Sequence, residues 1–304
     1  MAGIVEGKVA IVTGAGRGIG RAISLLMAAE GAHVLVNDVG AGLDGAGADT
    51  GPAQAVVEEI KKQGGKAIAN TLSISAPENS DKIVQAALDA FGRVDILVNN
   101  AGILRDRIFH KMSWSDWKDV IDVHLHGSFN MSRAVAGHFR EQGSGSMVHM
   151  TSTSGLIGNY GQANYMAAKM AIVGLSRSIA LDMERFGVRS NCIAPFAWSR
   201  MIGSIPTESE EEKRRVEKLQ QMTPEKIAPL VVYLACDRAK GISGQIFSVR
   251  NNEIFLFNQT RPIRSLHRAD GWTPERLDAQ LKGAFGPSLT PLDRSGDVFS
   301  WDPI

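Results

Sequence analysis

The sequence is poor in cysteine and contains no long apolar run. Its 304 residues include only Cys192 and Cys236, too few for a disulfide framework in a chain of this length. Neither cysteine has potential ligands at a spacing typical of a metal site, so we expect no bound metal. Residues 1–12 lack the features of a secretory signal, and no stretch approaches the roughly 18 apolar residues of a membrane span. We therefore expect a cytoplasmic protein that does not enter the membrane.

An excess of charge of either sign is also absent. The 33 basic and 32 acidic residues give a formal net charge of +1, whereas proteins that hold nucleic acid or anionic membranes by general attraction are usually strongly basic. We therefore expect neither a nucleic acid nor a membrane as partner. Glycine, by contrast, is abundant, with 32 residues in the chain against a usual level of about 7%.

Short apolar runs rich in β-branched residues alternate with stretches of helical periodicity. This alternation predicts βαβ units and a parallel sheet that is buried on both faces. The fold class is then α/β, a doubly wound, Rossmann-like three-layer sandwich, whose ligands bind at the carboxyl ends of the strands. The predicted strands are residues 9–12, 34–36, 67–69, 96–98, 147–150 and 188–193.

A glycine-rich run directly follows the first predicted strand. The residues from Thr13 to Gly20 read TGAGRGIG and lead into a helical pattern. Glycines permit a tight turn and let backbone N–H groups approach a pyrophosphate, while the helix N-terminus favours the anion. The run therefore predicts a dinucleotide site. Its expected contacts are Gly14, Arg17, Gly18, Ile19 and Gly20.

The second predicted strand ends at Asp38, eighteen residues after Gly20. A carboxylate there can accept hydrogen bonds from the adenosine ribose hydroxyls and repels a 2′-phosphate, which favours NAD over NADP. Arg17 argues the other way, since a cation in the glycine loop can serve a 2′-phosphate, but it can also point to solvent. We give Asp38 more weight, because placing it beside a phosphate costs more than leaving an arginine at the surface.

Tyr165 and Lys169 lie four residues apart in a helical stretch. This spacing places the phenol and the ammonium on one helix face, where the cation can lower the phenol's pKa from about 10 towards neutrality. Tyr165 is then usable as a general acid or base. Alone, the pair would more often be a surface lysine and a half-buried tyrosine. Ser152, however, follows the fifth predicted strand, where its hydroxyl can hold a substrate oxygen.

These motifs together resemble those of short-chain dehydrogenases/reductases over residues 7–250. The resemblance implies hydride transfer between an alcohol carbon and the nicotinamide of NAD. It also implies that Tyr165 donates or accepts the substrate proton, that Ser152 binds the substrate oxygen, and that Lys169 holds the nicotinamide ribose while assisting Tyr165. Further cofactor contacts implied in this way are Tyr165, Lys169, Asn100, Ala101, Gly102 and Pro195.

The chain departs from the common family pattern at three positions. His124 stands where the family usually has an asparagine that holds a relay water, and we expect it to bind that water as a further catalytic residue. Ser73 stands where an aspartate commonly lies beside the adenine, which weakens that cofactor contact. Phe196 follows Pro195 in place of a glycine and alters the loop beside the nicotinamide and substrate.

The departures point to one branch of the family. His124, the run Gly-Gln-Ala-Asn at 161–164 and the run Ser199-Arg200-Met201 are similar to the (3R)-hydroxyacyl-CoA dehydrogenases of peroxisomal multifunctional enzymes and their bacterial relatives. This likeness implies a small-molecule substrate, most readily the pair 3-hydroxyacyl-CoA and 3-oxoacyl-CoA. A hydroxysteroid dehydrogenase or a 3-oxoacyl reductase is the enzymatic alternative. A redox-sensing nucleotide-binding protein is the non-enzymatic one, against which the intact catalytic set argues.

We expect residues 1–250 to form one NAD-binding and catalytic domain and residues 251–304 to form a C-terminal extension that contacts substrate or a second subunit. Within the extension, Arg261, Arg264, His267 and Arg268 form a basic cluster. The cluster is either a solvated turn or a contact for the phosphates of coenzyme A. The family resemblance implies a homodimer or a homotetramer.

Overall fold

The computed structural model describes residues 2–42, 44–45, 47, 49–197 and 209–304. The run Ser199-Arg200-Met201, used above for the branch resemblance, lies outside these ranges. All other candidate site residues lie within them.

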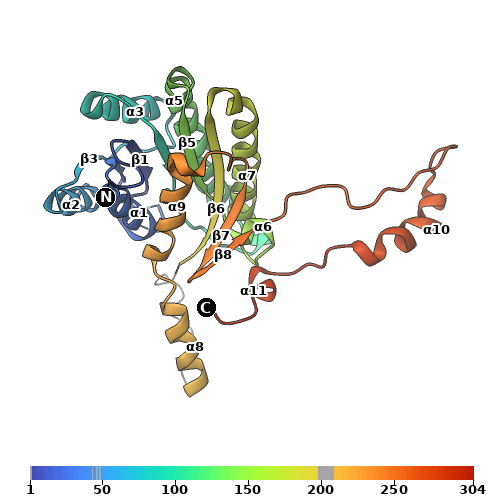
Figure 1. The fold of residues 1–304 in the computed structure, drawn as a ribbon. Helices are drawn as coiled ribbons and strands as arrows, with labels where there is room; N and C mark the ends of the chain where they lie inside the picture. Colours follow the sequence, from blue (N-terminus) through green and yellow to red (C-terminus); the bar gives the residue numbers. More distant parts are fainter. Residues whose placement is uncertain (1, 43, 46, 48, 198–208) are drawn as a thin grey trace.

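One central sheet organises the molecule (Figure 1). Within the described residues it has eight strands in the order β3-β2-β1-β4-β5-β6-β7-β8. Strand order runs outward from β1 in both directions and neighbours are parallel up to β7, which confirms the doubly wound, Rossmann-like fold. The strands are β1 (Val9–Thr13), β2 (His33–Asn37), β3 (Lys66–Asn70), β4 (Ile96–Asn99), β5 (Gly145–Met150), β6 (Val188–Phe196), β7 (Ile246–Arg250) and β8 (Glu253–Leu256).

The expectation of a wholly parallel sheet is wrong at its last strand. β8 pairs antiparallel with β7, and Arg250 lies opposite Glu253 across the turn. Only two residues join these strands, and a parallel pair would need a crossover of a dozen residues or more. Asn251 adopts a positive φ of 56° in this turn, a conformation that asparagine tolerates better than most residues. The sheet therefore continues past residue 250.

Helices cover both faces of the sheet and give the three layers. Apolar side chains of α1, α2 and α9 pack on one face in one buried cluster, and those of α3, α5 and the end of α7 pack on the other. The helices are α1 (Gly18–Ala29), α2 (Gly51–Lys62), α3 (Pro77–Phe91), α4 (Trp114–Ile121), α5 (Gly127–Gln142), α6 (Thr153–Leu156), α7 (Ala163–Met183), α8 (Glu210–Gln220), α9 (Ala228–Ala235), α10 (Pro274–Phe285) and α11 (Ser295–Val298).

The C-terminal extension leaves the body of the molecule after β8 and returns to it (Figure 1). Residues 258–292, which include α10, form an outward arm whose side chains are mostly exposed. The side chain of Thr273 accepts a hydrogen bond from the backbone N–H of Arg276 and caps α10. The chain then runs back through α11 and ends beside β8 (Figure 1).

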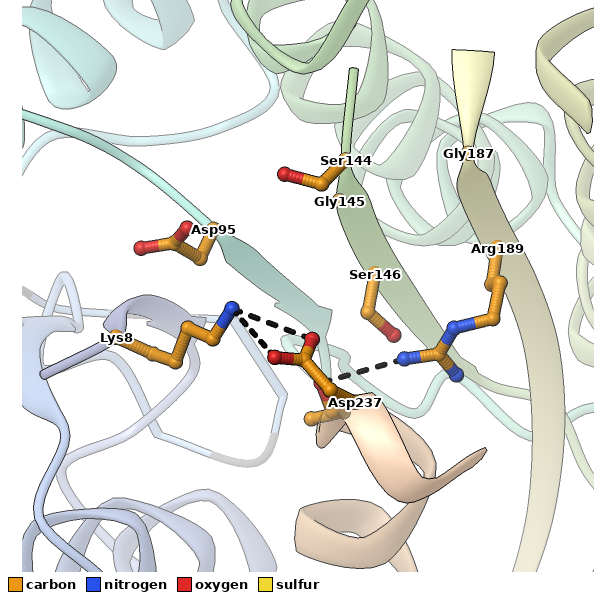
Figure 2. A pocket seen from close by; sticks show the side chains of 9 residues that line it. Lys8, Asp95, Ser144, Gly145, Ser146, Gly187, Arg189 and Asp237 are labelled. Atoms are coloured by element: carbon orange, nitrogen blue, oxygen red, sulfur yellow. Dashed lines mark hydrogen bonds and ion pairs between the residues drawn. The ribbon is translucent and has the colours of Figure 1, made fainter. Parts of the chain in front are cut away.

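A small hollow of about 40 Å³ lies at the amino ends of β4, β5 and β6 (Figure 2). Its charged groups are paired within the protein. Lys8 forms an ion pair with Asp237 at 3.0 Å, and the guanidinium of Arg189 donates to the carbonyl of Cys236 at 2.9 Å, just beyond α9. Ligands of doubly wound sheets bind at the opposite, carboxyl edge. We therefore interpret these contacts as structural, since they hold the end of α9 against the amino ends of the strands.

Candidate active site

The glycine loop between β1 and α1 is held against the segment that follows β4. The side-chain amide of Asn100 donates to the carbonyls of Thr13 and Gly14, both at 2.9 Å. The hydroxyl of Thr13 accepts from the backbone N–H groups of Asn100 and Ala101 at 3.1 Å. Gly14 has a φ of +62°, and a Cβ there would lie 2.7 Å from the Cα of Ala101. Two of the predicted cofactor residues, Asn100 and Ala101, therefore shape the loop themselves.

The same loop presents the N-terminus of α1. Gly18 begins this helix with a φ of +53°, and a Cβ at Gly20 would lie 2.2 Å from the carbonyl oxygen of Gly14. Arg17 occupies the capping position, but no side chain caps the helix. The first N–H groups of a helix without a side-chain cap favour an anion. The loop, which also contains Ile19, thus fits the pyrophosphate of a dinucleotide.

Asp38 lies directly after β2 and faces the glycine loop. One carboxylate oxygen accepts from the N–H of Gly16 at 2.8 Å and the other from the N–H of Gly40 at 2.7 Å. Each oxygen retains capacity for a further donor. The exposed side chain of Arg17 donates to the carbonyl of Ala41 at 3.4 Å. Asp38 and Arg17, the two residues expected to decide between NAD and NADP, therefore lie at one end of the site.

Two further predicted cofactor residues lie at the carboxyl edge of the sheet. Ser73 is exposed after β3, and its hydroxyl accepts from the N–H of Ser75 at 3.3 Å. Pro195 is the last residue but one of β6 and pairs with Val249 of β7.

Lys169 of α7 is buried and only 4% exposed. Its ammonium donates to the carbonyl of Met150, the last residue of β5, at 2.6 Å. Burial lowers its pKa to about 7. The same ammonium lies 5.5 Å from the ring centre of Tyr165, one turn earlier on α7. The predicted pair therefore shares one helix face, as its spacing indicated.

The expected lowering of the Tyr165 pKa is wrong for the protein's own groups. Burial raises the pKa of Tyr165, a hydrogen bond with Ser152 opposes this shift, and the charge of Asp106 adds to it. The free-energy cost of removing the phenolate from water is larger than the stabilisation that its hydrogen bond with Ser152 provides. Lys169 compensates little, because its own burial lowers the pKa of the ammonium to about 7.

Ser152 stands at the N-cap of α6, two residues after β5. Its hydroxyl accepts a hydrogen bond from the backbone N–H of Ser154 at 3.1 Å and also forms a hydrogen bond with the Tyr165 side chain. The serine, the tyrosine and the lysine thus meet at the carboxyl edge of β5. This set has a hydroxyl that can hold a substrate oxygen and a phenol that can exchange its proton.

His124 occupies a single π-helical turn, Asp122–His126, between α4 and α5. Such turns are frequent at functional sites. The imidazole is 3% exposed and packs edge-on against the Tyr165 ring, with the ring centres 5.3 Å apart. Its Nε2 lies 2.8 Å from the carbonyl oxygen of Ile103, while its Nδ1 has no hydrogen-bond partner in the described part of the chain. Burial, and secondly the charge of Lys169, lowers its pKa to about 3.

Gly102 leaves the room that His124 needs. A Cβ at residue 102 would lie 2.3 Å from the Cε1 atom of the imidazole. The glycine that was predicted to border the cofactor therefore also sets the position of the histidine ring.

Sequence reasoning assigned no structural role to Asn164. Its buried side-chain amide donates to the carbonyls of Arg105 at 2.9 Å and Asp116 at 2.8 Å. It thereby ties the segment after β4 to the start of α7, one residue before Tyr165. Asn164 belongs to the Gly-Gln-Ala-Asn run, but the sequence carries no signal for partners about fifty residues away.

Two negative findings concern the described residues alone. No three histidine, cysteine, aspartate or glutamate side chains gather there in a way that could hold a metal ion. No helix in those ranges is long and apolar enough to cross a bilayer.

Comparison with known sequences gives a consistent family. The family model for short chain dehydrogenases matches residues 8–208. The chain is 44% identical over 274 residues to the peroxisomal multifunctional enzyme type 2 of Mus musculus, covering 90% of this chain and 36% of that protein. It thus spans little more than a third of that relative. It is also 37% identical over 295 residues to a hydroxyacyl-CoA dehydrogenase of Mycobacterium tuberculosis, covering 92% and 89%.

Solved structures show the same fold. A short chain dehydrogenase from Mycobacterium avium has a TM-score of 0.84 at 37% identity, covering 97% of this chain and 100% of that one. A 7α-hydroxysteroid dehydrogenase complexed with NADH and 7-oxo glycochenodeoxycholic acid has a TM-score of 0.71 at 30% identity, covering 82% and 94%.

We expect the His124 imidazole to stay neutral from about pH 5 to 8, because burial lowers its pKa to about 3 from 6.5. Between these two pKa values the unfolded chain binds more protons, so acidification should destabilise the fold, and His124→Asn should weaken this dependence. Ring ¹⁵N–¹H correlation spectra, assigned with this variant, measure the protonation state. A His124 signal that titrates near pH 6.5 would contradict the burial described here.

Proposed function

The chain belongs to the short-chain dehydrogenase family, and on this basis we propose an NAD-dependent oxidoreductase that interconverts 3-hydroxyacyl-CoA and 3-oxoacyl-CoA. The observation that carries the proposal is the meeting of Ser152, Tyr165 and Lys169 at the carboxyl edge of the sheet, the edge at which the glycine loop follows β1. The set argues for catalysis over the alternative of a redox-sensing nucleotide-binding protein, which would need no proton donor beside the cofactor.

The three side chains supply the protein's part of the reaction. A nicotinamide dinucleotide, when bound, would supply the acceptor for the hydride of the alcohol carbon, or the hydride donor for the ketone carbon. Ser152 donates a hydrogen bond to the substrate oxygen, and Tyr165 accepts the hydroxyl proton in oxidation or donates it in reduction. Because burial raises the pKa of Tyr165, the phenol form needed for reduction prevails at neutral pH, and oxidation should accelerate as pH rises.

Lys169 and His124 support this proton transfer. Lys169 is held on the carbonyl of Met150, close to the tyrosine ring and to the place expected for the nicotinamide ribose. We propose that the Nδ1 of His124, which has no partner in the described part of the chain, accepts a hydrogen bond from a relay water. The ring is neutral near pH 7, since its pKa is about 3.

NAD is the cofactor that we propose, on the basis of Asp38. Its carboxylate lies over Gly16, where the cofactor's adenosine ribose is expected, and a 2′-phosphate would meet a negative charge there. The hydroxysteroid dehydrogenase with the related fold is complexed with NADH. The remaining expected contacts are Ser73, Gly102 and Pro195.

The substrate class rests on relatives. Both the mouse multifunctional enzyme and the mycobacterial hydroxyacyl-CoA dehydrogenase align over about nine tenths of this chain. A hydroxysteroid is the second candidate, because a structural neighbour of 30% identity is complexed with a steroid. A 3-oxoacyl reductase would usually use NADP, which Asp38 disfavours.

Within the basic cluster of the arm, we assign Arg261 and Arg264 to the phosphates of coenzyme A. Among the described residues, Arg261 and Arg264 form no ion pair, whereas Arg268 pairs with Asp270 at 2.7 Å. Exposed apolar side chains of the arm, such as Ile263 and Leu289, favour burial against a second copy of the chain. We therefore propose a homodimer or homotetramer. We also propose that the enzyme is cytoplasmic, since its two free, buried cysteines suit a reducing compartment.

Turnover by the wild type is tested with a panel of (3R)-hydroxyacyl-CoA thioesters and hydroxysteroids, following NADH formation. Tyr165→Phe should lower kcat about 10²- to 10⁴-fold, because the general acid–base group is lost, and should leave the Kd of NADH nearly unchanged. Near-normal activity of this variant would refute the role of Tyr165. NADH binding without turnover of any alcohol by the wild type would favour the sensor.

Replacing Asp38 should relax the selection against NADP. Two charges about 4 Å apart near a protein surface repel by about 1 to 4 kcal/mol, so Asp38→Ala should gain NADP affinity several-fold or more. Asp38→Asn separates charge from hydrogen bonding, since it should admit NADP while retaining more of the NAD affinity. Our assignment is wrong if Asp38→Ala still rejects NADP in kcat/KM measurements.

Removing the charges of Arg261 and Arg264, which form no ion pair among the described residues, should weaken binding of the coenzyme A thioester. The double variant Arg261→Gln/Arg264→Gln should raise the KM for a hydroxyacyl-CoA about two- to tenfold, as expected of exposed charge contacts. The KM for the matching N-acetylcysteamine thioester, which has no phosphates, should not change.

Arg268→Gln is the matched control, because its charge already meets Asp270. Sedimentation of each variant shows whether assembly has changed. An equal rise in KM for both thioesters would mean that Arg261 and Arg264 do not bind the phosphates of coenzyme A.

A further inference from the structure

The last twelve residues of the chain, 293–304, return to the carboxyl edge of the sheet, and we call them the C-terminal strap. They lie outside the segment of 8–208 that matches the family model. Two of their contacts fall on segments beside the catalytic set, one directly after Ser152 and one directly after Pro195.

The first contact fixes the segment that follows Ser152. The hydroxyl of Ser295 donates to the hydroxyl of Thr153 at 2.6 Å, across 142 positions of sequence. The backbone N–H of Ser295 donates to the carbonyl of Gly158 at 2.9 Å. A Cβ at Gly158 would lie 2.7 Å from the carbonyl oxygen of Asp293, so strap and segment approach closely. Thr153 is buried and begins α6, the helix that Ser152 caps.

The second contact fixes the end of β6. The ring of Phe299 is 9% exposed and meets Phe196 edge-on, with the ring centres 5.0 Å apart. The Phe299 ring also meets Phe255 of β8 edge-on, with the ring centres 5.2 Å apart. Phe196 is the residue that replaces the family's glycine next to Pro195. Its aromatic ring is therefore used as an anchor for the strap.

A buried cation closes this contact. Arg250 is 5% exposed, and its guanidinium lies 6.0 Å from the ring centres of both Phe196 and Phe299. It donates to the carbonyl of Trp301. Glu253 accepts from the indole N–H of Trp301 at 2.9 Å and lies 3.3 Å from Arg250. The hairpin of β7 and β8 thus holds the strap by charge as well as by apolar contact.

The strap also reaches α8, the next described helix after β6. Asp302 forms an ion pair with Lys218 at 2.8 Å. Three segments that are distant in sequence, at Thr153, Phe196 and Lys218, therefore share one support.

We propose that the C-terminal strap is a positioning element of the active site, with Ser295 and Phe299 as its positioning residues. Ser295 holds the backbone that carries Ser152, and Phe299 holds the backbone that carries Pro195. A shift of either backbone by about 1 Å can cost up to 10²-fold in rate, without loss of the fold. The kinetic part of this proposal rests on the proposed oxidoreductase function, whereas the structural part does not.

The first test measures backbone protection without any substrate. In Ser295→Ala, hydrogen exchange should accelerate at the amides of residues 153–158 and remain unchanged in β1 and β4. Ser300→Ala removes an exposed hydroxyl from the same strap and should match the wild type, while Ser295→Thr should restore protection. Unchanged exchange at 153–158 in Ser295→Ala overturns the proposal, as does a uniform increase throughout the sheet.

The second test measures kinetics with the best alcohol found for the wild type. Ser295→Ala and Phe299→Ala should each lower kcat/KM about tenfold, with the fraction of folded protein nearly unchanged. The Kd of NADH should stay nearly unchanged in Ser295→Ala and should rise in Phe299→Ala, because Phe299 holds the backbone of Pro195, an expected cofactor contact. Phe299→Leu, which retains an apolar contact, should recover part of the loss. Kinetic losses that follow only the fraction of unfolded protein overturn the proposal. Local loss of protection in an enzyme that oxidises none of the alcohols refutes the proposed function and leaves the structural role of the strap intact.

Discussion

The burial of one ammonium group constrains the catalytic edge of this protein. An amine removed from water is either neutralised or paired, and Lys169 meets this demand through the carbonyl of Met150, where β5 ends. This contact sets how α7 lies on the sheet. Tyr165 then stands one turn before the lysine, and Ser152 follows β5 by two residues. The three reactive groups are thus brought together by one hydrogen bond of a buried amine and by the close packing of the helix on the strands.

The regular part of the molecule could be predicted from its sequence. The six apolar runs from Val9 to Ile193 are strands because short, continuous runs of β-branched residues are typical of parallel strands that are buried on both faces. Their parallel arrangement brings the residues after each run to one edge. For this reason the sequence predicts that Asp38, Asn100 and Ser152 lie at one edge of the sheet, where the structure has them. Spacing alone was sufficient to put Tyr165 and Lys169 on one helix face.

Other features depend on contacts that no local pattern records. β7 and β8 are short, and their reversal depends on two asparagines without the glycine that usually signals a hairpin turn. The pKa of Tyr165 moves opposite to expectation, because spacing reveals a neighbouring charge but not how much water surrounds the phenol. The pKa of His124 is likewise set by burial that spacing does not reveal. Its imidazole is enclosed by the segment after β4, which includes Gly102, by its own π-helical turn and by α7. The strap joins residues 142 positions apart.

The outward arm begins at β8 and ends at the strap, so both of its ends are anchored to the body. For a flexible segment closed in this way, doubling its length costs only about 0.6 kcal/mol of chain entropy. Residues 258–292 can therefore change in length, charge and apolar content over evolutionary time while the anchors at Phe255 and Phe299 stay in place. The catalytic edge of the sheet and the arm can then diverge separately, because these parts of the chain share little packing.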